Sequence, residues 1–346
     1  MTGSRHERIR FAFGIAAILV AAAAVAVSLA IYAVAVMASG KPLFGDWTVY
    51  SDSAQRFLSG GSLYAQVQLD GPYLPWQSSR EGYLYPPPSI LLFLPFATGT
   101  AGMIGWVTLN AGLFMAGLAA VVRHELGRGW LFPFAFVLLG LTLYVPLHVG
   151  LTAANASVGV AGLYAFAWAR RDRPGAWAGI GAVVALLKVT PGLLAVFAAR
   201  RGGPRVLIAA AGVAIGISVV TLPLFGLDSW RDFFVSLSNV VPACIEGRFG
   251  PVCTLEPLLG AGGAKAIAAL IGLALALAAL RVRSERLAFV LIGAAILAPS
   301  PDLQVHYWLI AYVAFILVAV VPIARTVQRW RARQGAGRTT SAPGPS

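Results

Sequence analysis

The sequence predicts an all-α protein that crosses a membrane several times. Of its 346 residues, 58% are hydrophobic and 11% are charged, whereas soluble domains carry roughly 25% charged residues. The apolar runs have helical length, many reaching the ~20 residues that cross a bilayer, and none has the ~10-residue alternation of a transmembrane barrel strand. The first run, residues 11–37, exceeds the ~7–15-residue core of a signal peptide, so we interpret it as the first span.

The net charge of +13 is distributed as a membrane topology requires and does not indicate a nucleic-acid partner. Arginines gather before the first span, in short connections and in the C-terminal tail, whereas most acidic residues lie in the other connections. By the positive-inside rule, both termini and the basic connections are cytoplasmic, and the acidic loops face outward. The arginines are Arg5, Arg8, Arg10, Arg123, Arg128, Arg170, Arg171, Arg173, Arg200, Arg201, Arg205, Arg281, Arg283, Arg286, Arg325, Arg329, Arg331, Arg333 and Arg338.

Two large outer loops are expected, at residues 38–86 and 225–257. A loop as long as the first is either functional or disordered, and its many Trp and Tyr residues favour function, because disordered segments lack aromatic residues. Residues 46–58 have a helical pattern that Gly60-Gly61 would end. Since Trp and Tyr favour the head-group level, we expect one or two short helices along the outer membrane interface.

The later apolar runs predict about ten spans in total, in a single domain of residues 1–325 followed by a basic, disordered tail of residues 326–346. Residues 90–96 are too short to cross, so we interpret them as a half-depth segment. Two more short runs flank Lys188-Val189-Thr190-Pro191; because Lys and Pro interrupt them, we expect them to line a cavity. The other expected helices are 103–122, 131–147, 158–169, 177–187, 193–199, 206–224, 264–280, 287–297 and 308–323.

Asp46 is the first candidate for chemistry. It follows the first span closely, where the head groups of lipid-borne substrates lie, and a buried carboxylate there can deprotonate an acceptor hydroxyl. The alternative is a helix N-cap, a position that Asp favours, and position alone gives the two equal weight. Asp52 is either a further substrate contact or a solvated surface carboxylate, the second being favoured.

Lys188 stands between two apolar segments without a basic neighbour. Ionisable residues at membrane depth are costly and mark function, and an ammonium group suits a phosphate; snorkelling to the interface is the alternative. His306 begins the last span on the outer side, where a histidine binds phosphate, moves a proton or makes a structural hydrogen bond. Further candidate contacts to a donor or an acceptor are Tyr50, Tyr85, Arg56 and Asn155.

Cys244 and Cys253 are the two cysteines of the chain and fall in one outer loop. In an oxidising compartment a disulfide between them would close this loop, whereas a reducing compartment would leave two free thiols. We expect the disulfide.

No cofactor and no metal site are expected. The sequence has no Walker motif and no dinucleotide fingerprint, and no His, Cys and carboxylate residues with metal-ligand spacing. An ATP-driven or redox mechanism therefore has no support.

Five segments occur in a characteristic order. They are Asp46-Trp47-Thr48-Val49-Tyr50, Gly60-Gly61-Ser62-Leu63-Tyr64, Tyr85-Pro86-Pro87, Lys188-Val189-Thr190-Pro191, and Ser300-Pro301 with His306. Their order and their setting in the topology resemble glycosyltransferase family 87, the bacterial membrane mannosyltransferases that use polyprenyl-phosphate-mannose. The resemblance extends over about residues 11–325.

The resemblance implies a GT-C fold in the bacterial plasma membrane, with the active site on the outer face. It implies transfer of a sugar, with inversion, from a polyprenyl-phosphate donor to a hydroxyl of a lipid-linked or glycan acceptor. Asp46 would then be the base, and Lys188 and His306 would bind the donor phosphate. Because such a donor is already activated, the protein has to supply only the base, the cations and a groove for the prenyl chain.

Two other functions compete with this interpretation. Within the same reaction class, the donor would carry a pentose such as arabinose. From another class, the chain would be a transporter or flippase of lipid-linked sugars, although transporters commonly contain internal repeats and we find none. A non-catalytic protein that binds polyprenyl lipids is a third possibility.

The predicted topology is tested by fusing alkaline phosphatase after Ser346, because this enzyme needs disulfides and is inactive in the reducing cytosol. The fusion is expected to be inactive, and a fusion in the outer loop after Gly71 is the active control. An active fusion after Ser346 would contradict a cytoplasmic C-terminus.

Overall fold

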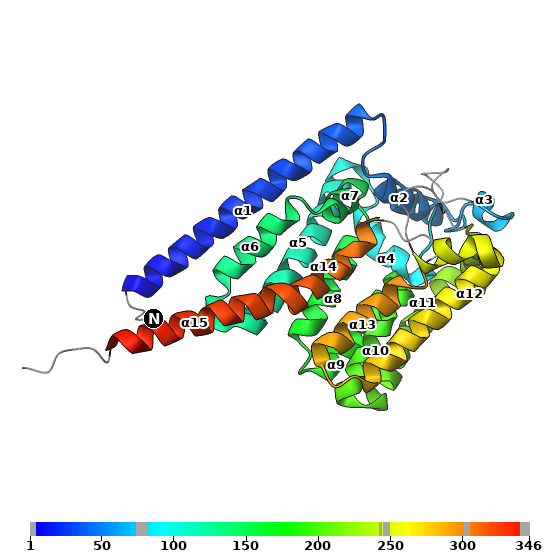
Figure 1. Ribbon diagram of the computed structural model, residues 1–346. Helices are drawn as coiled ribbons and strands as arrows, with labels where there is room; N and C mark the ends of the chain where they lie inside the picture. The colour runs from blue at the N-terminus through cyan, green and yellow to red at the C-terminus, as the bar shows by residue number, and fades with distance from the viewer. Residues whose placement is uncertain (1–4, 74–81, 242–243, 245–249, 301–304, 340–346) are drawn as a thin grey trace, which may run out of the picture.

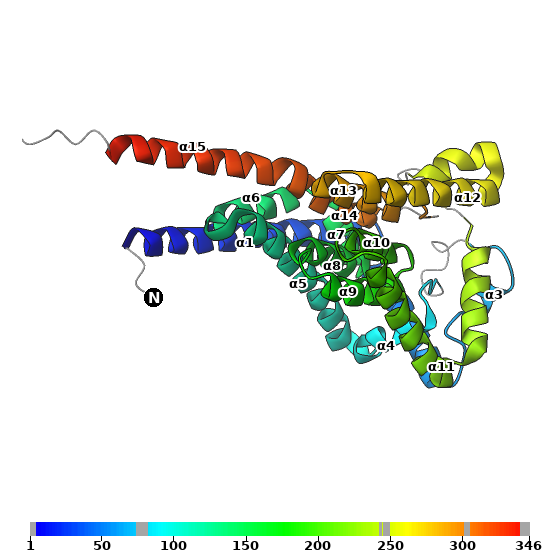
Figure 2. The ribbon, with the colours of Figure 1, turned by 90° about the horizontal axis from the view of Figure 1, so that it is seen from below.

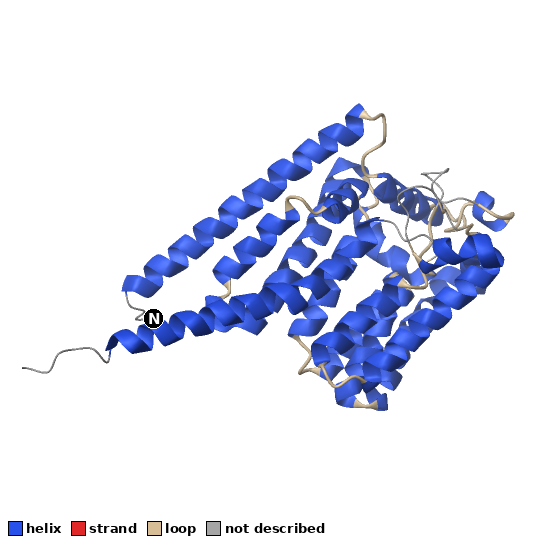
Figure 3. Ribbon diagram, viewed as in Figure 1, coloured by secondary structure: helices blue, strands red, loops and turns tan. Residues whose placement is uncertain are grey.

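The computed structural model describes residues 5–73, 82–241, 244, 250–300 and 305–339, of which 5–6, 174, 178 and 331–339 are described by their backbone alone. Within these ranges the regular elements are helices (Figure 3), and the one extended pairing is an isolated bridge between Tyr73 and Val240. The predicted all-α class is confirmed.

Five helical segments in the described ranges are long and apolar enough to cross a membrane. They are α1 (Arg5–Ala38), α5 (Gly99–Leu126), α11 (Pro204–Asn239), α12 (Pro251–Arg281), and the continuous run of α14 (Leu309–Phe315), a π-helical turn (Ile316–Val320) and α15 (Val321–Thr339). A sixth span results if α6 (Leu131–Leu141) and α7 (Val145–Ala153), which are bent by 73°, count as one. The chain is a multi-pass membrane protein.

The expected number of about ten spans is not confirmed. Helices α8 (Ser157–Ala169), α9 (Pro174–Leu187), α10 (Leu194–Gly202) and α13 (Glu285–Leu297) are all short. At 1.5 Å per residue, 13 residues reach only roughly 20 Å, less than the roughly 30 Å of a hydrocarbon core. The remaining elements are α2 (Gly45–Leu58), α3 (Gln66–Leu69), α4 (Ile90–Phe93) and the 3₁₀ turns Pro87–Ser89, Leu94–Phe96, Gly127–Gly129, Thr190–Leu193 and Val305–Trp308.

The helices form an elongated bundle with two distinct ends. The start of α1 and the end of α15 lie at the same end in both views, whereas α3 lies at the opposite end (Figures 1 and 2). Helix α2 lies close to α3 at this opposite end (Figure 1). The outer ends of the two terminal helices, which were expected to be cytoplasmic, and the first expected outer loop therefore lie at opposite ends of the molecule.

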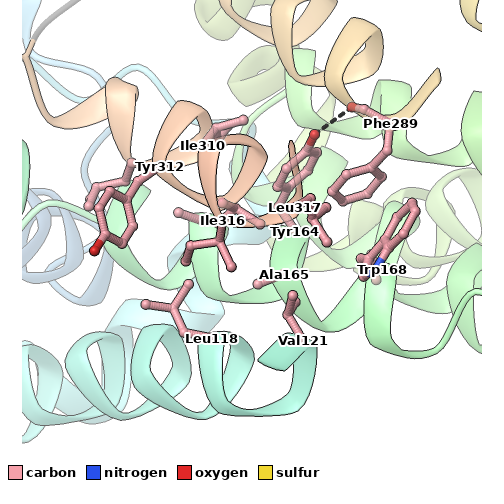
Figure 4. Close-up of a cluster of buried hydrophobic side chains, with 14 of the residues drawn as sticks. Leu118, Val121, Tyr164, Ala165, Trp168, Phe289, Ile310, Tyr312, Ile316 and Leu317 are labelled. Atoms are coloured by element: carbon pink, nitrogen blue, oxygen red, sulfur yellow. Dashed lines mark hydrogen bonds between the residues drawn. The ribbon is translucent and has the colours of Figure 1, made fainter. Parts of the chain in front are cut away.

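Aromatic and aliphatic side chains of α5, α8, α13, α14 and the π-helical turn meet in the part of the core that Figure 4 shows. The rings of Tyr164 and Phe289 stack at 4.1 Å between centroids, and the Tyr164 hydroxyl donates to the Phe289 carbonyl at 2.6 Å. Helices α5 and α8 cross here at Gly117 and Gly162, where a Cβ on either glycine would overlap the backbone of the facing helix. Small residues permit this close approach, as is common between membrane helices.

The predicted helix at residues 131–147 was wrong, because the chain breaks between α6 and α7. Pro146 lies in the first turn of α7, where its missing N–H costs nothing, whereas inside a continuous helix its ring would clash with the preceding turn. The predicted helix 46–58 agrees with α2, and 158–169 agrees with α8.

The expected outer loop 225–257 is helical at both ends. Helix α11 continues past a kink at Gly226 (φ 71°), and α12 begins at Pro251 and bends at Gly260 (φ 68°). Both glycines have positive φ values, which residues with a side chain disfavour. Each glycine lets its helix change direction, and the helix continues after it. Figure 2 shows the reversal in α11.

The tail also differs from expectation. Helix α15 extends to Thr339, although residues 326–346 were expected to be disordered; residues 340–346 lie outside the described part of the chain. Arg, Gln and Ala are good helix formers, and they continue a helix that the last span has already nucleated.

A buried carboxylate joins four helical segments near the end of the bundle that carries the chain termini. The side chain of Glu125 is 1% exposed and accepts hydrogen bonds from Trp168 Nε1 at 2.9 Å and from Arg286 Nη2 at 2.8 Å. Arg325 Nη2 donates at 2.7 Å, and Arg171 Nη2 lies 3.1 Å from the carboxylate. Some of the basic residues that indicated the topology thus have a structural role as well.

Replacing Glu125 by Gln is expected to destabilise the bundle, because Arg171, Arg286 and Arg325 would all lose the buried carboxylate on which they converge. Breaking a buried ion pair costs about 3–5 kcal/mol. The thermal unfolding midpoint of the detergent-solubilised protein measures the effect. The control is Glu285→Gln, because the Glu285 side chain is 34% exposed and pairs with Arg171 and Arg201. An equal shift in both variants would contradict the special role of Glu125.

Candidate functional site

A cavity of about 550 Å³ lies between α2, the α7–α8 turn, the segment around Lys188, and helices α11, α12 and α13. Most of its lining is apolar, but several polar side chains from distant parts of the sequence meet in it. These are Asp46, Tyr50, Tyr85, Asn155, Ser157, Lys188, Thr190, Lys265, Ser300 and Tyr307. Five of them were candidate residues in the sequence.

Asp46 belongs to the first turn of α2 and is not its N-cap. The N-cap is Phe44, in the left-handed conformation (φ 60°) and without a side-chain cap. The carboxylate of Asp46 accepts a hydrogen bond from Asn155 Nδ2 at 2.6 Å, and Asn155 Oδ1 accepts the Ser157 N–H at 2.8 Å. The backbone thus fixes the orientation of the Asn155 amide, and the amide orients the carboxylate.

Helix α2 is held against the bundle along its length. The Phe44 N–H donates to the Thr152 carbonyl at 2.6 Å, the Trp47 indole to the Phe96 carbonyl at 2.9 Å, and Ser51 Oγ to the Ala97 carbonyl. Each bond satisfies a backbone carbonyl at the C-terminal end of a helical element, a group that is costly to leave without a partner in an apolar setting. Asp46 is therefore held at a defined point in the cavity wall.

The α7–α8 turn, which carries Asn155, is anchored to α5. Ala154 adopts the left-handed conformation (φ 59°), and its carbonyl accepts the Trp106 indole N–H at 2.8 Å. One turn later, the Gly159 N–H donates to Asn110 Oδ1 at 3.0 Å. A strained non-glycine residue between two such anchors is a feature typical of functional sites.

Two tyrosines join the segment of residues 38–86 to the start of α8. The hydroxyls of Tyr50 and Tyr85 are 2.8 Å apart, and Tyr50 Oη accepts the Ala156 N–H at 3.3 Å. Burial, and secondly the negative charge of Asp46, raise the pKa of Tyr50 well above its ordinary value. The phenol therefore stays protonated at neutral pH and acts as a hydrogen-bond donor in the cavity.

Lys188 ends α9 in extended conformation and reaches across the cavity. Its Nζ donates to Ser157 Oγ at 2.9 Å and lies 3.6 Å from the centroid of the Tyr307 ring, a cation–π contact. Ser157 lies two residues after Asn155, so one turn of chain contacts both the carboxylate and the cation. The predicted cavity around Lys188 is present, and the snorkelling alternative does not describe this geometry.

The structure adds cavity residues that the sequence analysis missed, chiefly Lys265 and Tyr307. Lys265 Nζ donates to the Val240 carbonyl at 2.6 Å. Its sequence signal was the same as that of Lys188: a single cation beside a long apolar run, here residues 266–280. Tyr307 gave no such signal, because a tyrosine at the start of a span is ordinary.

Three candidate residues are not among the described residues that line the cavity. Asp52 lies on α2, away from this lining. Arg56 donates to Ser53 Oγ at 2.9 Å and to the Leu63 carbonyl at 3.0 Å, so it ties α2 to the following loop. His306 is 1% exposed, whereas its neighbour Tyr307 lines the cavity. Elsewhere, Cys244 and Cys253 form a disulfide with their Cα atoms 5.1 Å apart.

A second, almost wholly apolar groove of about 500 Å³ adjoins the cavity. Helices α9 and α11 form most of it, and Val189 and Phe233 line both the groove and the cavity. Its other lining residues include Leu186, Val219 and Trp230. The polar cavity thus continues into a surface suited to a hydrocarbon chain.

The cavity can therefore hold a ligand between a carboxylate and cations. Within the described ranges, no three or more His, Cys, Asp or Glu side chains are grouped so that they could hold a metal ion.

The tyrosine contact is tested by Tyr50→Phe, which removes a hydroxyl bonded to Tyr85 and to the Ala156 N–H. A buried N–H left without a partner costs about 1–3 kcal/mol, so a lower thermal unfolding midpoint is expected in detergent. Tyr32→Phe is the control, because the Tyr32 hydroxyl makes no hydrogen bond to the described part of the chain. Equal midpoints for Tyr50→Phe and wild type would contradict the structural role of this hydroxyl.

Comparisons with known proteins identify the family. The family model of glycosyltransferase family 87 matches residues 83–301, well over half of the chain but less than the span of residues 11–325 expected from the sequence. The matched region includes Tyr85, Asn155, Lys188 and Lys265, and Asp46 precedes it. Comparisons with curated proteins and with solved structures give no match. The chain belongs to glycosyltransferase family 87 and is a membrane glycosyltransferase.

Proposed function

We propose that the protein transfers mannose, with inversion, from a polyprenyl-phosphate donor to a hydroxyl of a lipid or cell-envelope glycan acceptor on the outer face of the bacterial plasma membrane. The observation that carries this proposal is the cavity that holds the Asp46 carboxylate and the Lys188 ammonium together. Glycosyltransferases transfer sugars and not acyl or phosphoryl groups. A glycosyl phosphate donor would use both the carboxylate of Asp46 and the ammonium of Lys188.

The reaction is a single displacement. Asp46 takes the proton of the acceptor hydroxyl as its oxygen attacks the anomeric carbon from the face opposite the phosphate. The bond between the anomeric carbon and the phosphate oxygen breaks, and its electron pair leaves with the polyprenyl phosphate. Attack from the opposite face inverts the configuration of the anomeric carbon.

Lys188 stabilises the charge that develops on the leaving phosphate. Its ammonium is already oriented by Ser157 and by the Tyr307 ring, and a preoriented cation in a mostly apolar cavity stabilises such charge more than solvent does. His306 was expected to share this role. Since it does not line the cavity, we assign the position beside Lys188 to Tyr307.

The prenyl chain of the donor would occupy the apolar groove. This groove shares Val189 and Phe233 with the cavity, so a lipid lying in it would bring its phosphate to the segment that carries Lys188. Each CH₂ removed from water contributes about 0.8 kcal/mol, which explains how a mostly apolar site would hold a long donor.

The direct test is transfer of labelled mannose from polyprenyl-phosphate-mannose to membrane lipids by purified protein in vesicles. Asp46→Asn is expected to lower transfer by about 100-fold or more, the range of general-base catalysis, while donor binding is retained. Asp52→Asn is the matched control, because it makes the same change on the same helix outside the cavity lining.

Three outcomes would count against the proposal. Equal transfer by wild type and Asp46→Asn would remove Asp46 as the base. Loss of transfer in Asp52→Asn alone would move the base to the other carboxylate of α2. No transfer by wild type from this donor, with transfer from polyprenyl-phosphate-arabinose, would replace mannose by a pentose.

A further inference from the structure

Lys265 places a second cation in the wall of the cavity. It lies on the spanning helix α12, five residues after the bend at Gly260, and its side chain is half-buried. A lysine at this depth is costly, and in membrane proteins such residues face a cavity or a functional group.

Positive charge exceeds negative charge among the described residues that line the cavity. Among the described lining residues, Asp46 is the one carboxylate, whereas Lys188 and Lys265 both carry positive charge. No described carboxylate forms a salt bridge with Lys265, whose hydrogen bond goes to the neutral carbonyl of Val240. At the other end of the bundle, by contrast, Arg171, Arg286 and Arg325 all reach Glu125.

The hydrogen bond to Val240 does not by itself require a charge. Val240 also forms the bridge with Tyr73, and the Asn239 side chain donates to the Gln68 and Leu69 carbonyls. The two outer loops are therefore joined by several contacts besides Lys265. A neutral hydrogen-bond donor at position 265 could bond to the Val240 carbonyl equally well. For this bond alone, the ammonium of Lys265 would add only the free-energy cost of burying its charge.

We infer that Lys265 forms a second anion subsite of the cavity, one that binds a lipid-borne phosphate. This inference rests on the proposed function, in which the cavity already holds one glycosyl phosphate at Lys188. The phosphate at Lys265 belongs either to the polyprenyl-phosphate donor, which both lysines would then contact, or to a phospholipid acceptor. In both cases the ligand is a phosphate ester with a hydrocarbon tail.

The test measures binding and is therefore independent of sugar transfer. The thermal unfolding midpoint of the full-length protein in detergent is titrated with polyprenyl phosphate and, separately, with phosphatidylglycerol. Lys265→Gln removes the charge and keeps a hydrogen-bond donor, whereas Lys265→Arg keeps the charge. Lys41→Gln, at an exposed position, controls for the loss of one positive charge.

For one of the two lipids, Lys265→Gln is expected to weaken binding about tenfold or more, because a hydrogen bond to a charged group is worth about that factor. Lys265→Arg should restore most of the affinity, and Lys41→Gln should bind like wild type. A defect toward polyprenyl phosphate assigns the subsite to the donor, and a defect toward phosphatidylglycerol assigns it to an acceptor.

Unchanged affinity of Lys265→Gln for both lipids would overturn the inference. It would also be overturned if Lys265→Arg bound as poorly as Lys265→Gln and both unfolded at lower temperature without ligand, because Lys265 would then only hold the loops together. A wild-type protein that binds phosphate lipids through Lys265 but transfers no sugar would reject the proposed function and leave the subsite in place.

Discussion

A charged side chain inside a membrane protein is stable only when the protein supplies its partners, and this constraint determines where the polar groups of this chain lie. In an apolar medium, a carboxylate or ammonium without partners costs several kcal/mol. The structure meets the requirement in two places. At one end of the bundle, Glu125 is surrounded by arginines and the Trp168 indole. At the other, Asp46 and Lys188 are held by two side chains of a single turn.

The two places differ in what they leave for a ligand. Around Glu125 the positive charges converge on one carboxylate and pack against the core. In the cavity, the described lining residues include one carboxylate and two lysines around a volume of about 550 Å³; Lys188 contacts a hydroxyl and an aromatic ring, and Lys265 a backbone carbonyl. The first arrangement joins helices to one another, whereas the second lines an open volume.

The rigidity of the cavity depends on helix contacts outside it. The α7–α8 turn is held by Trp106 and Asn110 of α5, and α5 packs closely against α8 because Gly117 and Gly162 lack side chains. Asn155 therefore reaches Asp46 from a supported position. A site that must keep a base within hydrogen-bond distance of an acceptor benefits from such support, because small displacements of catalytic groups are costly.

Residues outside the family match complete the site. Residues 83–301 supply Tyr85, Asn155 and both lysines, and the preceding α2 supplies Asp46 and Tyr50. The role of Asp46 is thus supported by its geometry: it is oriented by Asn155 and faces the same cavity as Lys188.

Much of this protein was determined by its sequence alone. Composition and the length of the apolar runs predicted an all-helical membrane protein, because a bilayer leaves few ways to satisfy the backbone. The position of Lys188 between apolar segments identified it as a candidate, since charge at membrane depth is costly. Asp46 was a candidate because it follows the first span closely.

Only the tertiary structure decided which candidates meet. Asp46 and Asn155 are 109 residues apart, and no local pattern reveals that their side chains form a hydrogen bond. His306 and Tyr307 are adjacent in sequence, yet the direction of one 3₁₀ turn buries the first and brings the second to Lys188. The expected number of about ten spans is not confirmed, because an apolar run does not say whether its helix crosses the membrane, bends as α6 and α7 do, or ends at a cavity. Those outcomes depend on what each helix packs against, which is a property of the whole fold.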